Sequence, residues 1–127
     1  MGSRTVFQQR HQRLIMNASI KQAWIDALRS NNYKQGIGNL RHGDCYCCLG
    51  VLTDMYIQQH GQEWHHDVAG LYSFQTEGGV LPRAVQEWAE LDSSNPFVGG
   101  LDIAARNDNG DSFELIASLI DSSLYSL

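Results

Sequence analysis

The sequence predicts one mainly α (α+β) domain, with about four to six helices and a small β-sheet or hairpin. Three observations lead to this prediction. The length of 127 residues fits a single domain. Apolar residues recur at helical spacing in four segments, and the glycine-rich stretches between them leave room only for short strands. We expect an N-terminal extension at residues 1–16 and a single globular domain at residues 17–127.

The first predicted helix spans residues 19–30. Ser19 is its expected N-cap, and Gln22 three positions later completes a capping box. One apolar face follows at helical spacing: Ile20, Trp24, Ala27 and Leu28. The glycines at positions 36 and 38 then predict a loop or an irregular strand pair across residues 33–41.

A second helix is expected to begin near Cys45 and to end at Gly61, a residue suited to a left-handed C-terminal cap. Its apolar face comprises Cys48, Leu52, Met55 and Tyr56. Residues 71–75 predict a short strand, and the glycine pair at 78–79 predicts a turn.

Further helices are predicted in the C-terminal third. Pro82 suits the first turn of one helix, with a buried face of Leu81, Val85, Trp88 and Ala89. Residues 101–106 predict a short helix. In the last helix Asp111 is the expected N-cap and Glu114 completes a capping box. Its apolar stripe comprises Phe113, Ile116, Ala117, Ile120 and Leu124.

The charged side chains are unevenly distributed. Residues 1–41 carry seven basic side chains against one acidic, a net charge of +6, and residues 42–127 carry two against thirteen, a net charge of −11. We expect the basic end to pack on the acidic body of its own or a neighbouring chain. A basic arm is also typical of nucleic-acid binding, but the acidic body repels phosphate at long range. Nucleic-acid binding through the N-terminal arm is therefore an alternative rather than the main prediction.

Residues 4–15 have an amphipathic pattern, with arginines beside one narrow apolar stripe at helical spacing: Phe7, His11, Leu14 and Ile15. We expect this segment to dock on a second copy of the chain and to form a homodimer. No apolar run approaches the ~18 residues of a membrane span, and no signal-peptide core is visible. We therefore expect a cytoplasmic protein with no membrane contact.

Several separated motifs resemble a family of small proteins from phages and bacteria. They are WIDALRS at 24–30, YKQG at 33–36, YCCLGVL at 46–52 and NDNG at 107–110. The resemblance extends over residues 20–120. It implies a gene carried on mobile DNA and implies no particular activity. Relatives of this kind begin near Met16, which is why residues 1–16 are treated as an extension.

All three cysteines fall within four positions. Cys47 and Cys48 are expected in the core, because free cysteine behaves as a small hydrophobe. Their spacing does not provide the two separated pairs of a structural zinc site, so neither a metal nor another cofactor is expected.

Cys45 carries the alternative of a cysteine-dependent hydrolase. In the first turn of a helix, the helix dipole would lower its thiol pKa. His65 or His66 would act as the base, and Asp67 would orient it. Asp44-Cys45 before an apolar run also resembles the start of bacterial cell-wall cysteine peptidases.

The main prediction is a small binding or interaction protein of mobile-element origin without catalytic activity. No complete catalytic set is visible, and the aromatic and glycine-rich loops favour binding. The partner is expected to be a host protein or a small molecule. The candidate binding residues are Tyr33, Gln35, Arg41 and Trp64.

Overall fold

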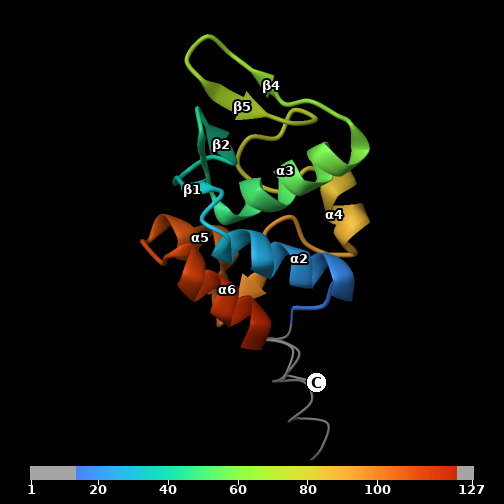
Figure 1. Ribbon diagram of the computed structural model, residues 1–127, viewed down its shortest axis with the longest axis vertical. Helices are drawn as coiled ribbons and strands as arrows, with labels where there is room; N and C mark the ends of the chain where they lie inside the picture. The colour runs from blue at the N-terminus through green and yellow to red at the C-terminus, as the bar shows by residue number, and fades with distance from the viewer. Residues whose placement is uncertain (1–13, 123–127) are drawn as a thin grey trace, which may run out of the picture.

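Five helices and seven short strands make up residues 14–122, the part of the chain that the structure, a computed structural model, describes (Figure 1). The helices are α2 (Ala18–Arg29), α3 (Cys48–His60), α4 (Arg83–Ala89), α5 (Ile103–Asp108) and α6 (Phe113–Ser122). The strands are β1 (Lys34–Gln35), β2 (Arg41–His42), β3 (Cys45–Tyr46), β4 (His65–His66), β5 (Leu71–Ser73), β6 (Phe97–Val98) and β7 (Leu101–Asp102).

The strands show that the prediction of a mainly helical protein was wrong. Five strands form one mixed sheet in the order β1-β3-β2-β5-β4, and β6 and β7 form a separate hairpin. The fold is therefore a small α+β domain with a five-stranded mixed sheet. Within this sheet β1 pairs with β3 in parallel, and the other pairs are antiparallel. The strands are two or three residues long, too short for the alternating pattern of a strand to show in the sequence.

The register of the sheet brings three long side chains to one face. Gly43 and Asp44 form the two-residue loop between β2 and β3, and Gly43 has a φ of 60°, which glycine adopts without strain. Arg41 on β2 lies directly opposite Tyr46 on β3 and opposite Tyr72 on β5. Because directly opposite residues share a face, these three side chains point the same way.

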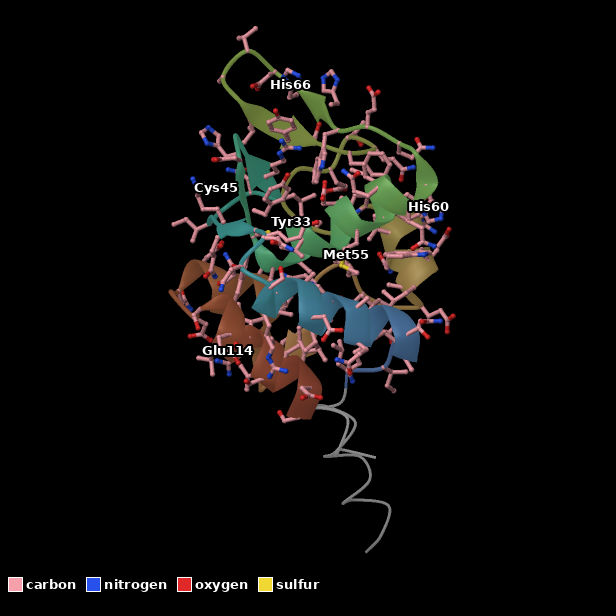
Figure 2. The ribbon with its side chains drawn as sticks, in the orientation of Figure 1. Tyr33, Cys45, Met55, His60, His66 and Glu114 are labelled. Atoms are coloured by element: carbon pink, nitrogen blue, oxygen red, sulfur yellow. The ribbon has the colours of Figure 1, made fainter. Side chains whose placement is uncertain are left out.

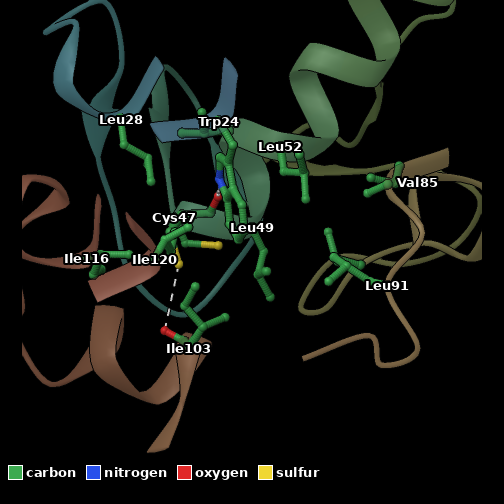
Figure 3. Packing of buried hydrophobic residues seen from close by; sticks show 14 of the residues in the cluster. Trp24, Leu28, Cys47, Leu49, Leu52, Val85, Leu91, Ile103, Ile116 and Ile120 are labelled. Atoms are coloured by element: carbon green, nitrogen blue, oxygen red, sulfur yellow. Dashed lines mark hydrogen bonds between the residues drawn. The ribbon is translucent and has the colours of Figure 1, made fainter. Parts of the chain in front are cut away.

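The helices enclose one apolar core. α2 packs along α6 and also contacts α3 (Figure 1). Trp24 of α2 is fully buried, and its indole N–H donates to the Cys48 carbonyl at 3.0 Å. Figure 3 shows the Trp24 ring among side chains from α2, α3 and α6. The predicted stripe of the last helix is buried as far as Ile120; Leu124 lies outside the described residues.

Two helix caps differ from the predicted ones. The side chain of Asn17, not Ser19, accepts the N–H of Ile20 and caps α2. At α6 the Ser112 hydroxyl accepts the N–H of Leu115, whereas Asp111 forms an ion pair with Arg106 at 2.9 Å. In both cases two capping-type residues lie within three positions of each other, and local spacing alone does not decide which of them caps the helix.

The start of α3 was also predicted wrongly. Cys45 and Tyr46 form β3, and the helix begins at Cys48. The N-cap residue Cys47 makes no side-chain capping bond. The side-chain oxygen of Asn107 instead accepts the N–H of Cys48 at 3.2 Å. A residue of α5 thus caps α3 from 59 positions away.

Asn107 is a fully buried connection between several elements. Its Nδ2 donates to the Gly36 carbonyl at 2.7 Å, and its Oδ1 also accepts from the Gln35 amide at 2.9 Å. Gln35 in turn donates to the Asp111 carbonyl and accepts the Phe113 N–H at the start of α6. The two amides therefore fasten β1, α3, α5 and α6 together.

Gly50 lets the chain pass directly over α3. A Cβ at this position would overlap the carbonyl group of Leu40. The Leu40 carbonyl also accepts the N–H of Cys47 at 3.2 Å. The glycine of the YCCLGVL motif is therefore required by the close contact with the Leu40 backbone.

The predicted N-terminal stripe lies largely outside the described residues, since the structure describes nothing before residue 14. Of its four members, Leu14 is buried in the core and Ile15 is 60% exposed. The homodimer formed through residues 1–16 stays a prediction.

We expect Gly50→Ala to lower the free energy of unfolding by more than about 4 kcal/mol, because neither the helix nor the Leu40 backbone can move without losing packing. Urea unfolding measures the loss. Gly79→Ala is the control, since a Cβ there meets nothing within 4 Å. A stable Gly50→Ala protein would show that the strand connection does not lie against α3.

We expect Asn107→Ala to cost about 3–5 kcal/mol, because it leaves the Cys48 N–H, the Gly36 carbonyl and the Gln35 amide without their buried partner. Thermal and urea unfolding measure the loss. Asn109→Ala removes an exposed amide two residues away and is expected to change stability by less than about 0.5 kcal/mol. Equal losses in the two variants would contradict the role of Asn107.

Candidate functional site

Three of the four predicted binding residues gather beside α3. Tyr33, Arg41 and Trp64 come from three separate parts of the chain and are all half-buried. The fourth, Gln35, is held in the Asn107 network, where its side chain makes three hydrogen bonds within the frame. Gln35 therefore has a structural role in the fold.

Asp54 of α3 fixes two of these residues. Its carboxylate is only 6% exposed. The Tyr33 hydroxyl donates to one of its oxygens at 2.7 Å, and the Trp64 indole N–H donates to the other at 2.9 Å. Sequence reasoning missed Asp54. A signal was available, because Asp54 is the only charged residue in segment 48–57, which is largely apolar.

Four aromatic rings form a continuous row around this anchor. Tyr33 meets Tyr46 edge to face with centroids 5.0 Å apart, and Tyr46 meets Trp64 at 6.3 Å. Trp64 then meets Tyr72 at 6.1 Å with perpendicular planes. Edge-to-face pairs at these distances are favourable because the positive edge of one ring faces the negative face of the next. Each of the four residues keeps part of its surface exposed.

Arg41 lies against these rings. Its guanidinium carbon is 3.8 Å from the centroid of Tyr72, 5.0 Å from Tyr46 and 5.8 Å from Trp64. These distances are typical of cation–π contacts. Its Nε donates to the Gly43 carbonyl at 2.8 Å. We call Tyr33, Arg41, Tyr46, Trp64 and Tyr72 the arginine–aromatic site.

The guanidinium of Arg41 has no carboxylate partner within residues 14–122. Three nearby acids are engaged elsewhere. Asp54 accepts from Tyr33 and Trp64, and Asp44 pairs with Lys34 at 3.2 Å. Asp67 accepts the amides of Leu71 and Ala69 in the β4–β5 turn. These hydrogen bonds lower the pKa of the Asp67 carboxyl, and the bond from the Leu71 amide has the largest effect.

The phenols of the site stay protonated at neutral pH. Burial raises the pKa of Tyr33 well above its usual value, and the hydrogen bond to Asp54 raises it further. Burial also raises the pKa of Tyr46, and the nearby charge of Asp54 adds to this effect, although Arg41 opposes it. The Tyr33 hydroxyl is therefore a stable donor to Asp54 across the physiological range.

Cys47 and Cys48 are core residues, which confirms that prediction. They are 3% and 0% exposed. Burial raises the pKa of both thiols. The Cys48 thiol donates to the Ile103 carbonyl at 3.7 Å, the dashed line in Figure 3.

Cys45 lies in a strand rather than in the first turn of a helix, so the helix dipole does not act on its thiol. Its cross-strand neighbours are His42 on β2 and Lys34 on β1. The thiol donates to the adjacent Asp44 carboxylate at 3.7 Å.

The two histidines proposed as the base lie on an edge strand of the sheet, three strands away from the Cys45 thiol. His65 and His66 form β4, and the strands β2 and β5 lie between β4 and β3. Three strand spacings place the histidines about 14 Å from Cys45, and Figure 2 shows Cys45 and His66 on separate strands. Asp67 is taken up by the β4–β5 turn. The structure does not bring the four candidate catalytic residues together, and within residues 14–122 it gathers no group of three His, Cys, Asp or Glu side chains suited to a metal ion.

His66 borders the arginine–aromatic site instead. Its ring lies 4.9 Å from that of Tyr72, tilted by 33°. His65 is exposed on the same edge strand.

We expect Tyr33→Phe to cost about 1–2 kcal/mol at pH 7, through the lost bond to the Asp54 carboxylate. Because folding raises the pKa of Tyr33, this bond contributes stability that is complete below about pH 10, the pKa of an unfolded tyrosine, and is lost as pH rises further. The variant should therefore lose less stability than the wild type above pH ~10.

Urea unfolding across this pH range tests the expectation. Tyr72→Phe is the control for loss of a hydroxyl, because the Tyr72 hydroxyl makes no hydrogen bond within residues 14–122. Identical alkaline stability curves for the wild type and Tyr33→Phe would contradict the Tyr33–Asp54 contact.

Comparisons with known proteins place the chain in one family. No curated protein and no solved structure matched it significantly. No helix within residues 14–122 has the length and apolar character needed to cross a bilayer. The phage and bacterial origin that the motifs imply stays a prediction. A family profile described as a domain of unknown function, DUF8296, matches residues 16–124, which is most of the chain. The protein is therefore a member of the DUF8296 family.

Proposed function

We propose that the protein is a non-catalytic binding protein, and that a segment of a partner protein docks on the arginine–aromatic site. The observation that carries this proposal is the gathering of Arg41, Trp64 and three tyrosines, all partly exposed, from separate parts of the chain. Tryptophan, tyrosine and arginine dominate the energetics of protein–protein interfaces. They bury large areas at a small cost in side-chain entropy.

The site is held in position before any partner arrives. Asp54 anchors Tyr33 and Trp64, and the β3–β2–β5 pairing sets Tyr46, Arg41 and Tyr72. Side chains that are already ordered lose little freedom on binding, so more of the contact energy remains as affinity. This supports a recognition role.

The size of the site favours a protein segment among the expected partners. The residues lie on three adjacent strands, in the loop before β4 and, for Tyr33, directly before β1. At ~4.8 Å per strand this distance corresponds to several residues of an extended peptide. A host protein is therefore the partner we propose.

Selection of a random phage-displayed peptide library on the immobilised protein tests the proposal. We expect binders whose affinity falls at least tenfold with Tyr72→Ala, a loss of about 1.4 kcal/mol or more. Tyr72 is chosen because its ring contacts Arg41 while its hydroxyl supports no other described residue. Trp64 is unsuitable, because its loss would leave Asp54 with an unpaired oxygen.

Phe97→Ala is the matched control. Phe97 is also an exposed aromatic residue, but it belongs to the separate β6–β7 hairpin. Binding should change less than twofold in this variant, a difference below about 0.4 kcal/mol. Peptides that depend on Phe97 and not on Tyr72, or no peptides at all, would refute the proposed site.

A further inference from the structure

We infer that the arginine–aromatic site recognises a carboxylate, the side chain of an aspartate or glutamate in the partner segment. This inference rests on the proposed function and specifies the chemistry of its ligand. In this inference Arg41 binds the acidic side chain, and the aromatic rings contact the residues on either side of it in the partner segment.

The first argument is the unmet bonding capacity of Arg41. Its Nε is bound to the Gly43 carbonyl, which together with the Tyr72 ring fixes the guanidinium plane. The terminal nitrogens find no acceptor within residues 14–122. A guanidinium presents paired N–H groups whose geometry matches the two oxygens of a carboxylate. Its partial burial among rings strengthens such a bond by keeping water away.

The second argument is that the protein does not supply the acid itself. Each oxygen of Asp54 already accepts one hydrogen bond from a neutral donor, and Asp44 is paired with Lys34. Asp67 holds its own turn through two backbone amides. Bringing any of these carboxylates to Arg41 would break a bond already formed. The positive charge at the site is therefore left for a ligand.

The third argument favours a carboxylate over a phosphate. A phosphate monoester carries nearly two negative charges at neutral pH, and Arg41 is a single cation. Lys34 aligns with Cys45, so it points to the opposite face of the sheet from Arg41. His66 contacts the Tyr72 ring rather than Arg41. The −11 charge of residues 42–127 also disfavours a strongly anionic ligand.

Two matched phage libraries test the inference. They display random peptides fused at their C-termini, so that no free terminal carboxylate is present, and one library omits aspartate and glutamate. We expect binders that depend on Tyr72 only from the library that contains acids. In synthetic amidated peptides, replacing the key acid by its amide should weaken binding at least tenfold.

Variants of Arg41 locate the contact. Arg41→Gln should also weaken binding at least tenfold, and it should cause no further loss with the amide peptide, because both changes remove the same bond. Arg41→Lys should recover only part of the affinity, since an ammonium keeps the charge but not the paired geometry. Arg83→Gln, at an exposed arginine of α4, is the control and should leave affinity unchanged. Equal thermal midpoints show that each variant is folded.

The remaining outcomes separate the inference from the proposed function. The acid-free library could yield binders that depend on Tyr72 and bind as tightly as those from the library with acids. That result would refute recognition of a carboxylate but would still support the arginine–aromatic site. If Arg41→Gln weakened the binding of the acid peptide and of the amide peptide equally, Arg41 would have a structural role only. That result would also refute recognition of a carboxylate by Arg41. A phosphoserine peptide that binds tenfold more tightly would reassign the anion to phosphate. If neither library yields such binders, the proposed function itself fails and the inference fails with it.

Discussion

The buried side-chain amide of Asn107 is the interaction on which the arrangement of the other elements depends. Cys47 is the single residue between β3 and α3 and is the N-cap of the helix. Its side chain makes no capping hydrogen bond. Asn107 reaches in from α5, accepts the first helical N–H, and binds the Gly36 carbonyl with its other end. Because an unpaired buried amide is costly, β1, α3 and α5 fit together in one arrangement only. Gly50 completes it by letting the chain before β2 lie against the helix.

This frame has a direct consequence for the surface. The start of α3 at Cys48 determines where Asp54 lies six residues later, and Asp54 then binds both Tyr33 and Trp64. The buried carboxylate takes its hydrogen bonds from neutral donors and forms no ion pair with Arg41 within residues 14–122. The rings of Tyr46 and Tyr72 stabilise the guanidinium without neutralising it. A rigid, partly exposed cation among aromatic side chains results from how the interior is hydrogen-bonded.

The sequence predicted what depends on local periodicity and missed what depends on distant partners. Apolar spacing identified the buried stripe of α6 as far as Ile120. For α2 it identified Trp24 and Leu28 but missed Ile25, which is buried, whereas Ile20 and Ala27 are only half-buried. The hydrophobic character of free cysteine placed Cys47 and Cys48 in the core. Strands of two residues carry no periodic signal, so the sheet was underestimated and Cys45 was assigned to a helix. Gln35 was a reasonable binding candidate until its partner Asn107, 72 positions away, gave it a structural role. Three binding candidates, which are of the aromatic and arginine types common in recognition sites, did converge.

The central claim is that one hydrogen-bonded frame holds the arginine–aromatic site in place before a ligand binds. Native-state hydrogen exchange, read by NMR at the Cys48 amide and the Trp64 indole N–H, tests it most directly. If the Asn107 cap and the Asp54 anchor are permanent, both hydrogens should exchange only as fast as the whole domain unfolds. Exchange near the rate of an unstructured peptide at either position, in a protein that is otherwise protected, would show that the frame opens locally and would contradict a preformed site.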